Sequence, residues 1–280
     1  MAVSVLLSRL ANDGVDMSEV ATEPEQADIL VVVFTYSGSC HGDVLKYVAS
    51  LYGSMIGNPR LGSLSVSYSA GYPTDRCRNA ALEAARKRGA RFLLMLDDDM
   101  KPDLLLGQDP EAKPFLPTAF DFAMNQPGPV CVGAPYCAGP PNQDVVVMRN
   151  RVIVPDMPGD VGTKLDKYSR EEAAVAKGFE EVAALPTGCL LIDMRCLERM
   201  DPPYFQYEYQ DEAQTKLAST EDIFFTRNAA WLGYKQYVLW DAWAGHHKKY
   251  LTGKPQLSVV GAVPKMIFKA FQNGYMPELN

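Results

Sequence analysis

The feature that most constrains the fold is an unbroken apolar run, Phe92–Leu96, which leads directly into three consecutive aspartates, Asp97–Asp99. A second run, Ile29–Phe34, is also apolar at every position. Runs of this length without polar alternation are typical of strands buried on both faces, as in a parallel sheet covered by helices. The sequence therefore predicts two central strands, one of which ends in a cluster of carboxylates.

The segments between these two runs complete a doubly wound pattern. Residues 43–55 predict a helix and residues 64–69 a further strand. Residues 73–89 predict a second helix, with alanines at helical spacing and a glycine at its end. Sheets built from alternating strands and helices bind ligands at the carboxyl ends of their strands. We therefore expect Thr35, Tyr36 and the aspartates to line one crevice.

The second half of the chain predicts short strands separated by turns rich in proline and glycine. A helix starting after Ser219 or Thr220, with Ile223, Phe224, Ala230 and Trp231 on one side, then precedes a last strand at residues 236–240. The expected fold class is α/β: a Rossmann-like central mixed sheet flanked by helices, with a second, smaller sheet. The short strands are expected at residues 130–134, 145–148, 152–154, 181–185 and 190–193.

Composition narrows the function classes. No apolar run reaches the length of a membrane span, and we read no secretion signal, so a soluble cytoplasmic protein is expected. The six cysteines lack zinc-binding or CxxC spacing and are expected as buried thiols. A net charge of −7 disfavours a dedicated polyanion binder. No GxGxxG or Walker A motif is present, which disfavours dinucleotide dehydrogenases and P-loop enzymes.

The acidic triplet Asp97–Asp99 creates an electrostatic problem at the end of its strand. Two ionised carboxylates about 4 Å apart repel by roughly 4 kcal/mol near a protein surface. A divalent cation removes this repulsion and creates a site for phosphates. A solvated acidic turn is the simpler alternative, and the apolar strand before the triplet favours the metal site.

Two later features could complete such a site. Glu221 and Asp222 open a helix, where carboxylates also gain stability from the helix dipole alone. His246 follows Gly245, and along an extended backbone His246 and His247 cannot point the same way. Oxygen ligands with one nitrogen suit Mn²⁺ somewhat better than Mg²⁺, and a carboxylate left over could act as a general base.

Together these pieces resemble GT-A fold glycosyltransferases of the family 2 type. Residues 75–80 and 93–99 resemble the helix and DXD strand of that family, and the resemblance spans roughly residues 28–250 in the family's order. The other matching segments are residues 185–192, similar to the acceptor-side "TG" strand, residues 220–225 with 233–235, similar to the "ED" helix, and residues 245–246, similar to the closing metal-binding histidine.

The resemblance implies a nucleotide-diphosphate sugar donor, with a UDP-sugar favoured, and a manganese cofactor, with Mg²⁺ as an alternative. It implies that Asp99 and His246 bind the metal, while Asp97 or Asp98 contacts the ribose or completes the metal shell. The other residues that it places at the donor are Thr35 and Tyr36, which would flank the nucleotide, and Arg76 or Arg78, which would lie near its pocket or phosphates.

The resemblance also implies that the acidic pair supplies the base that deprotonates an acceptor hydroxyl, with inversion at the anomeric carbon. Asp222 is favoured for this role, with Glu221 as the alternative. The implied organisation is one catalytic domain at residues 28–250, preceded by a peripheral arm and followed by a basic tail that could be a lid. The boundaries expected are 1–27 for the arm, 28–125 for the donor half, 126–250 for the acceptor half and 251–280 for the tail.

The chain departs from the family pattern at one position, and two other functions remain open. Many relatives carry an aspartate that reads uracil just after the second strand, where this chain has Ser67-Tyr68-Ser69, so the donor base is not fixed. A nucleotidyltransferase would usually need a basic, glycine-rich loop, and residues 37–42 lack lysine and arginine. A non-catalytic nucleotide-sugar or glycan-binding module is the other alternative. The acceptor could be a glycan, another hydroxyl-bearing molecule or a modified nucleic-acid base.

Overall fold

A computed structural model describes residues 25–35, 38–71, 73–139, 144–153, 163–248 and 251–255. Most of the predicted N-terminal arm, Tyr36 and all but five residues of the predicted C-terminal tail lie outside the described residues. The functions expected of those parts therefore stay predictions. In the described part, no helix combines the length and the apolar character needed to span a bilayer.

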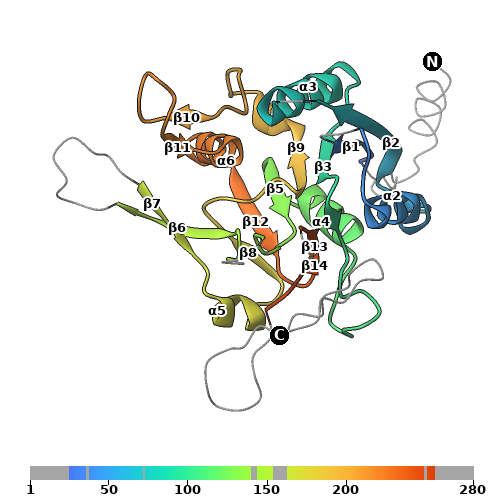
Figure 1. Cartoon of the computed structure of the whole chain (residues 1–280). Coiled ribbons are helices and arrows are strands. Elements are labelled where there is room, and N and C mark those ends of the chain that lie inside the picture. Colours follow the sequence, from blue (N-terminus) through green and yellow to red (C-terminus); the bar gives the residue numbers. More distant parts are fainter. Residues whose placement is uncertain are drawn as a thin grey trace, which may run out of the picture.

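A central sheet of seven strands forms the middle layer of the molecule (Figure 1). In spatial order its strands are β2 (Leu61–Ala70), β1 (Ala27–Thr35), β3 (Phe92–Asp97), β9 (Cys189–Asp193), β5 (Val130–Gly133), β12 (Lys235–Leu239) and β8 (Phe179–Glu181). The β2, β1 and β3 strands are parallel, β9 runs antiparallel between β3 and β5, and β8 is antiparallel at the edge. The predicted mixed α/β class is confirmed.

Two apolar layers cover the two faces of this sheet. Leu30 and Val32 of β1 face α3 (Thr74–Lys87) and α6 (Glu221–Trp231). The alternate residues Ile29 and Val31 belong to the opposite layer, with α2 (Gly42–Met55) and α4 (Phe115–Met124). Because both faces are covered, β1 and β3 must be apolar throughout, which is why their sequences show no alternation.

Among the described residues, three small sheets lie around the central one, where the sequence predicted a single second sheet. The sheet that shapes the site has the order β14 (Leu251–Thr252), β13 (Gly245–His247) and β4 (Met100–Lys101). The remaining elements are the antiparallel pairs β6 (Met148–Ile153) with β7 (Thr163–Lys167) and β10 (Glu208–Tyr209) with β11 (Leu217–Ser219), the short helix α5 (Arg170–Val175) and a 3-10 turn at Met194–Leu197.

Two of the predicted short strands differ from the structure. The strand expected at residues 181–185 is β8, which ends at Glu181. The Val182 amide still donates to Gln236 of β12, and the chain then pairs with the other predicted strand. The Ala183 amide donates to the Met148 carbonyl and the Met148 amide to the Ala184 carbonyl. Val145 forms only an isolated bridge with Cys137. These pairings follow from tertiary contacts that local sequence does not encode.

The buried face of α6 also differs from the predicted one. Phe225 and Ala229 are fully buried, whereas Trp231 is 66% exposed. The Phe225 ring stacks on Phe205, with ring centroids 4.6 Å apart, and this contact helps to set the rotation of the helix. The helix carries apolar residues on several sides, so the packing partner decides which of them are buried.

Candidate functional site

The acidic turn lies where the two halves of the sheet meet. Asp97 is the last residue of β3, and its amide donates a hydrogen bond of 3.0 Å to the Gly188 carbonyl just before β9. A Cβ on Gly188 would stand 2.8 Å from the Tyr136 hydroxyl, which accepts a hydrogen bond from the Gly188 amide. Only glycine therefore lets the TG segment approach the turn this closely.

A pocket of about 300 Å³ opens beside this turn. It gathers residues from β1, α3, the acidic turn, α6 and β13, which are far apart in the sequence. The residues predicted for the site that line this pocket are Thr35, Arg78, Asp97, Asp98, Asp99, Glu221 and His246.

Asp99 and His246 form the closest pair of candidate metal ligands in this pocket. Strand β13 pairs with β4, and this places His246 Nε2 3.3 Å from Asp99 Oδ2. The other ring nitrogen, Nδ1, lies 3.0 Å from the Cys137 carbonyl, which can only accept, so Nδ1 must carry a proton. In the neutral imidazole, the Nε2 lone pair then faces the carboxylate, and a proton or a cation must lie between them.

The separation of these two atoms suits a shared cation. Metal–ligand bonds of about 2.0–2.2 Å at right angles place two ligand atoms about 3 Å apart. The hydrogen bond from Nδ1 to a carbonyl is also the arrangement that fixes the tautomer of metal-binding histidines. Asp99 and His246 therefore fit one divalent cation, with oxygen and nitrogen ligands of the kind that Mn²⁺ accepts.

Lys248 already balances the charge of Asp99. Its ammonium donates a 2.5 Å hydrogen bond to the same carboxylate oxygen that faces His246. Burial opposes ionisation of Asp99, but His246 and Lys248 outweigh it and lower the pKa of Asp99 to about 2. Asp99 is thus ionised at neutral pH, with Lys248 as a counterion on the same oxygen that faces His246.

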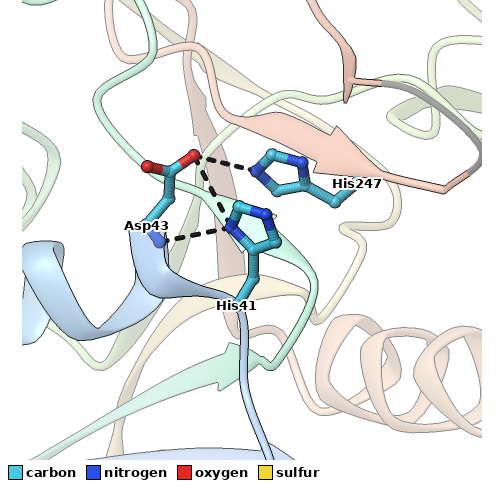
Figure 2. Close-up of side chains that lie close together, drawn as sticks. All are labelled: His41, Asp43 and His247. Atoms are coloured by element: carbon cyan, nitrogen blue, oxygen red, sulfur yellow. Dashed lines mark hydrogen bonds and ion pairs between the residues drawn. The ribbon is translucent and has the colours of Figure 1, made fainter. Parts of the chain in front are cut away.

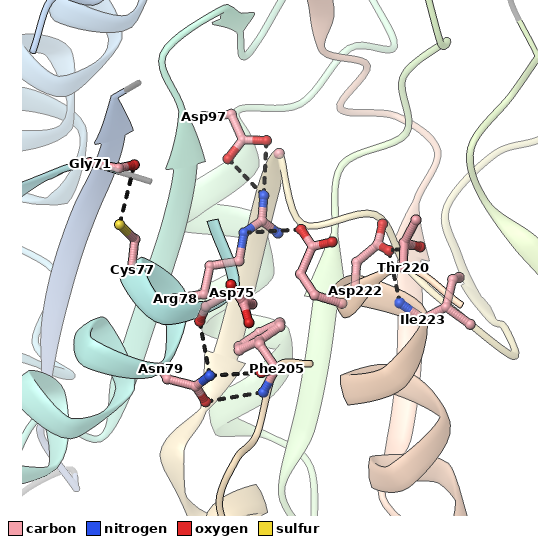
Figure 3. Close-up of polar contacts among 12 residues, drawn as sticks. Gly71, Asp75, Cys77, Arg78, Asn79, Asp97, Phe205, Thr220, Asp222 and Ile223 are labelled. Carbon is pink, nitrogen blue, oxygen red and sulfur yellow. Dashed lines mark hydrogen bonds and ion pairs between the residues drawn. The ribbon is translucent and has the colours of Figure 1, made fainter. Parts of the chain in front are cut away.

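Arg78 is the buried cation on the α3 side of the pocket (Figure 3). Its side chain is 5% exposed, and Nη2 donates to both oxygens of Asp97 at 3.0 and 3.2 Å. Its Nε lies 3.6 Å from Glu221 Oε1. Burial opposes the charge, but Asp97 first, then Glu221 and Asp222, raise the pKa of Arg78. Removing this guanidinium would leave several carboxylates without their counterion.

Several buried polar atoms in the pocket wall have no hydrogen-bond partner within the described chain. These are Nε and Nη1 of Arg78 and the hydroxyl of Thr35. A buried donor without a partner costs about 1–3 kcal/mol, and more when it is charged. Such groups at a pocket wall indicate a polar, anionic ligand that would complete their hydrogen bonds.

The two acidic residues at the start of α6, Glu221 and Asp222, have different surroundings. Glu221 is buried and lines the pocket, and burial, first among several causes, raises the pKa of its carboxyl group. Asp222 is not among the pocket-lining residues. Its carboxylate accepts hydrogen bonds from the Thr220 hydroxyl and the Ile223 amide (Figure 3). Thr220 and Ile223 line a separate hollow of about 370 Å³, so Asp222 lies between the pocket and this hollow.

The structure separates the two arginines predicted for the donor site. Arg78 points into the pocket, whereas Arg76 lines another hollow, beside Pro202 and Tyr204. Both lie on α3, and their spacing of two residues puts them on different faces of the helix. Tyr36, predicted to flank the nucleotide, lies outside the described residues.

Seven of the described residues that line the pocket were not singled out as site residues in the sequence, and two of them, Tyr136 and Lys248, contact the Asp99–His246 pair. Tyr136 is buried, and its ring lies edge-on to His246 at 5.1 Å between centroids. It follows β5 in a turn without a recognisable motif. Lys248 lies two residues after His246 and just before the predicted basic tail, where no motif marks it as a site residue.

His41, Asp43 and His247 form a second cluster of side chains (Figure 2), and the backbone amides of the two histidines bond to carbonyls of the acidic turn. His247 Nε2 is 2.9 Å and His41 Nδ1 3.7 Å from Asp43 Oδ2, and the two imidazoles stack with centroids 3.5 Å apart. His41 is the N-cap of α2 and accepts a 3.2 Å hydrogen bond from the Asp43 amide. Burial, more than any other cause, lowers the pKa of His247. The opposite orientations of His246 and His247 agree with the prediction from strand geometry.

Neither a protein-family model nor a curated protein sequence matches this chain. Among solved structures, A197 from STIV is similar with a TM-score of 0.50 and 15% identity, over 84% of this chain and 97% of that chain. The structure of GalNAc-T7 with UDP, GalNAc and Mn²⁺ is similar with a TM-score of 0.40 and 10% identity, over 79% of this chain and 44% of that chain. The first likeness shows a shared fold alone, and the second is too weak to add to it.

Proposed function

We propose that this protein is a metal-dependent, inverting glycosyltransferase that uses a nucleoside-diphosphate sugar, with a UDP-sugar as the first candidate. The observation that carries the proposal is the approach of His246 Nε2 to within 3.3 Å of Asp99 Oδ2 in a pocket whose wall holds unpaired donors of Arg78. The sequence resemblance to family 2 enzymes supplies the reaction class.

Asp99 and His246 would hold the cation. Asp97 or Asp98 would contact the ribose of the nucleotide or supply a further ligand to the metal. A divalent cation there neutralises charge that develops on a departing diphosphate. Arg78 pairs with the carboxylates of Asp97 and Glu221 and holds them at the pocket wall, where its Nη1 has no hydrogen-bond partner among the described residues. Lys248, once released from Asp99, offers a mobile ammonium to the phosphates.

Asp222 is our candidate for the base. It lies between the donor pocket and the hollow lined by Thr220 and Ile223, which we assign to the acceptor. A base must reach the acceptor hydroxyl on the side of the sugar opposite the leaving group, and a carboxylate between the two sites meets that requirement. Glu221 contacts Arg78 and Tyr207, and we assign it to holding Arg78 in place.

The test is binding and turnover with a panel of nucleoside diphosphates and nucleotide sugars in the presence of Mn²⁺. We expect Mn²⁺-dependent binding of one nucleoside diphosphate and slow release of that diphosphate from its sugar. Asp99→Ala should abolish both. Release of pyrophosphate from a nucleoside triphosphate would instead indicate nucleotidyl transfer, and binding without turnover would indicate a binding module.

A further inference from the structure

The chain contains three histidines, and all of them meet at the acidic turn. His246 faces Asp99 on the pocket side, whereas His41 and His247 lie on the other side with Asp43. We propose that His41, Asp43 and His247 form a second metal site, which takes a transition cation of the zinc class and clamps the backbone of the acidic turn. This site is independent of sugar transfer.

The ligand atoms already lie near the spacing that such a cation needs. Tetrahedral zinc, with bonds of about 2.0–2.2 Å, places its ligand atoms about 3.3 Å apart. The two measured separations from Asp43 Oδ2, 2.9 Å to His247 and 3.7 Å to His41, fall on either side of that value. Two imidazole nitrogens and one carboxylate oxygen favour zinc-class metals over Mg²⁺ or Ca²⁺.

Binding requires two small changes in the cluster. The cation takes the place of the proton in the hydrogen bond between His247 Nε2 and Asp43. It also requires His41 Nδ1 to give up the hydrogen bond that it accepts from the Asp43 amide. Stacked rings direct their lone pairs along nearly parallel lines, so one imidazole must turn about its side-chain torsions for both to converge (Figure 2). The side chains are 17–33% exposed, which leaves room for this turn and for water as a fourth ligand.

The backbone connections give the site its consequence. The His41 amide donates a 2.8 Å hydrogen bond to the Asp98 carbonyl, and the His247 amide a 2.7 Å bond to the Asp99 carbonyl. A cation held by the two imidazoles would therefore join the two segments that grip the acidic turn from behind. Lys46 and Lys101, whose ammonium groups lie 3.7 and 3.9 Å from the Asp43 carboxylate, are the basic side chains that would have to tolerate this added charge.

The test uses zinc and the variant His246→Ala, which removes the nitrogen ligand of the donor site and leaves only two histidines, both in the cluster. One equivalent of Zn²⁺ should shift both imidazole NMR signals and give a calorimetric stoichiometry of one. Adding Asp43→Asn to the His246→Ala variant should weaken zinc binding by at least about tenfold. Asp121→Asn, an exposed carboxylate on α4, is the matched control and should change nothing.

The proposal is overturned if zinc binds without moving the signals of His41 and His247, or does not bind. If His246→Ala does not fold, Asp99→Ala serves in its place, and zinc should then shift the signals of His41 and His247 more than that of His246. Zinc should also raise the melting temperature of the variant with the intact cluster and not of the one carrying Asp43→Asn. If the unaltered protein bound no nucleoside diphosphate of the panel with Mn²⁺, the proposed function would be overturned and these outcomes would be unaffected.

Discussion

The two sides of the acidic turn make opposite use of adjacent histidines. On the pocket side, His246 faces Asp99 among Arg78, Lys248 and further carboxylates. On the other side, His247 faces Asp43 and stacks on His41 at the start of α2. The strand period of two residues puts neighbouring side chains on opposite faces, so one short strand can serve both sides.

The difference lies in what surrounds each histidine. The pocket side has buried groups without partners and an arginine that is almost fully enclosed, which indicates a ligand from outside. The other side is small, its groups already contact one another, and its backbone amides hold the turn. This contrast fits the proposed functions, in which the pocket side binds the donor and the His41–Asp43–His247 side holds the turn in place.

The largest effect should come from the proposed base. Asp222→Asn should lower turnover by about 10²–10⁴-fold, because proton transfer to a positioned carboxylate contributes roughly that much. Nucleoside diphosphate binding with Mn²⁺ should stay within about twofold, measured by calorimetry. If Asp43→Asn lowered turnover equally, the division between the two sides would be wrong.

Arg78 should dominate the stability of the pocket side. Arg78→Met removes the counterion of Asp97 and Glu221 from a buried position, and we expect a loss of about 3–5 kcal/mol in the free energy of unfolding by urea. Lys101→Ala, on the other side, removes only a partly exposed pair 3.9 Å long, and its cost should stay below about 1 kcal/mol. If the two variants lost the same free energy of unfolding, the proposed difference between the two sides of the turn would be wrong.

The histidines themselves provide a direct comparison. His246→Ala should weaken Mn²⁺-dependent binding of the nucleoside diphosphate by about 10–100-fold, because it removes one metal ligand. His247→Ala should weaken it by less, since its side chain faces away from the pocket. Titrations of both variants at fixed Mn²⁺ measure the ratio, and a larger loss for His247→Ala would reverse the assignment of the two sides.

The smallest effect concerns pH, measured on metal-free protein. The pKa of Asp99 is lowered to about 2, so its stabilising effect is present at neutral pH and is lost as the pH falls from about 4 toward 2. Burial raises the pKa of Asp103 to about 6, although a backbone hydrogen bond from Phe115 opposes this rise. The Asp103 contribution to stability therefore changes with pH in the direction opposite to that of Asp99. The Asp103 contribution to stability should fall as the pH rises from about 4 to 6, and Asp103→Asn should make the slope in urea titrations shallower over that range.

Much of the fold could be predicted because the central strands carry the information locally. The runs at β1 and β3 are apolar at every position, and α3 shows helical spacing with a glycine after it. The strands at residues 145–148 and 181–185 were misplaced because their pairing depends on contacts between distant segments. The face of α6 was wrong because the stacking of Phe225 on Phe205 sets its rotation.

Some residues of the candidate site could likewise be predicted from local sequence, and others could not. Asp97–Asp99, Glu221 and His246 could be named because they occupy recognisable positions after a strand, at a helix start and after a glycine. Arg76 could not be separated from Arg78, since both have the same chemistry and the choice depends on the rotation of α3. Tyr136 and the partnership of His41 with His247 were missed because no local pattern marks them.

The amino-acid sequence by itself determined the parallel core, the carboxylates at the end of a buried strand and the opposite directions of two adjacent histidines. Each of these follows from short-range periodicity and side-chain chemistry. Only the tertiary structure decided that His246 meets Asp99, that Arg78 is the buried counterion and that Asp43 contacts both His41 and His247. Those contacts depend on the pairing of β13 with β4 and the docking of α2 and α3, which join segments far apart along the chain.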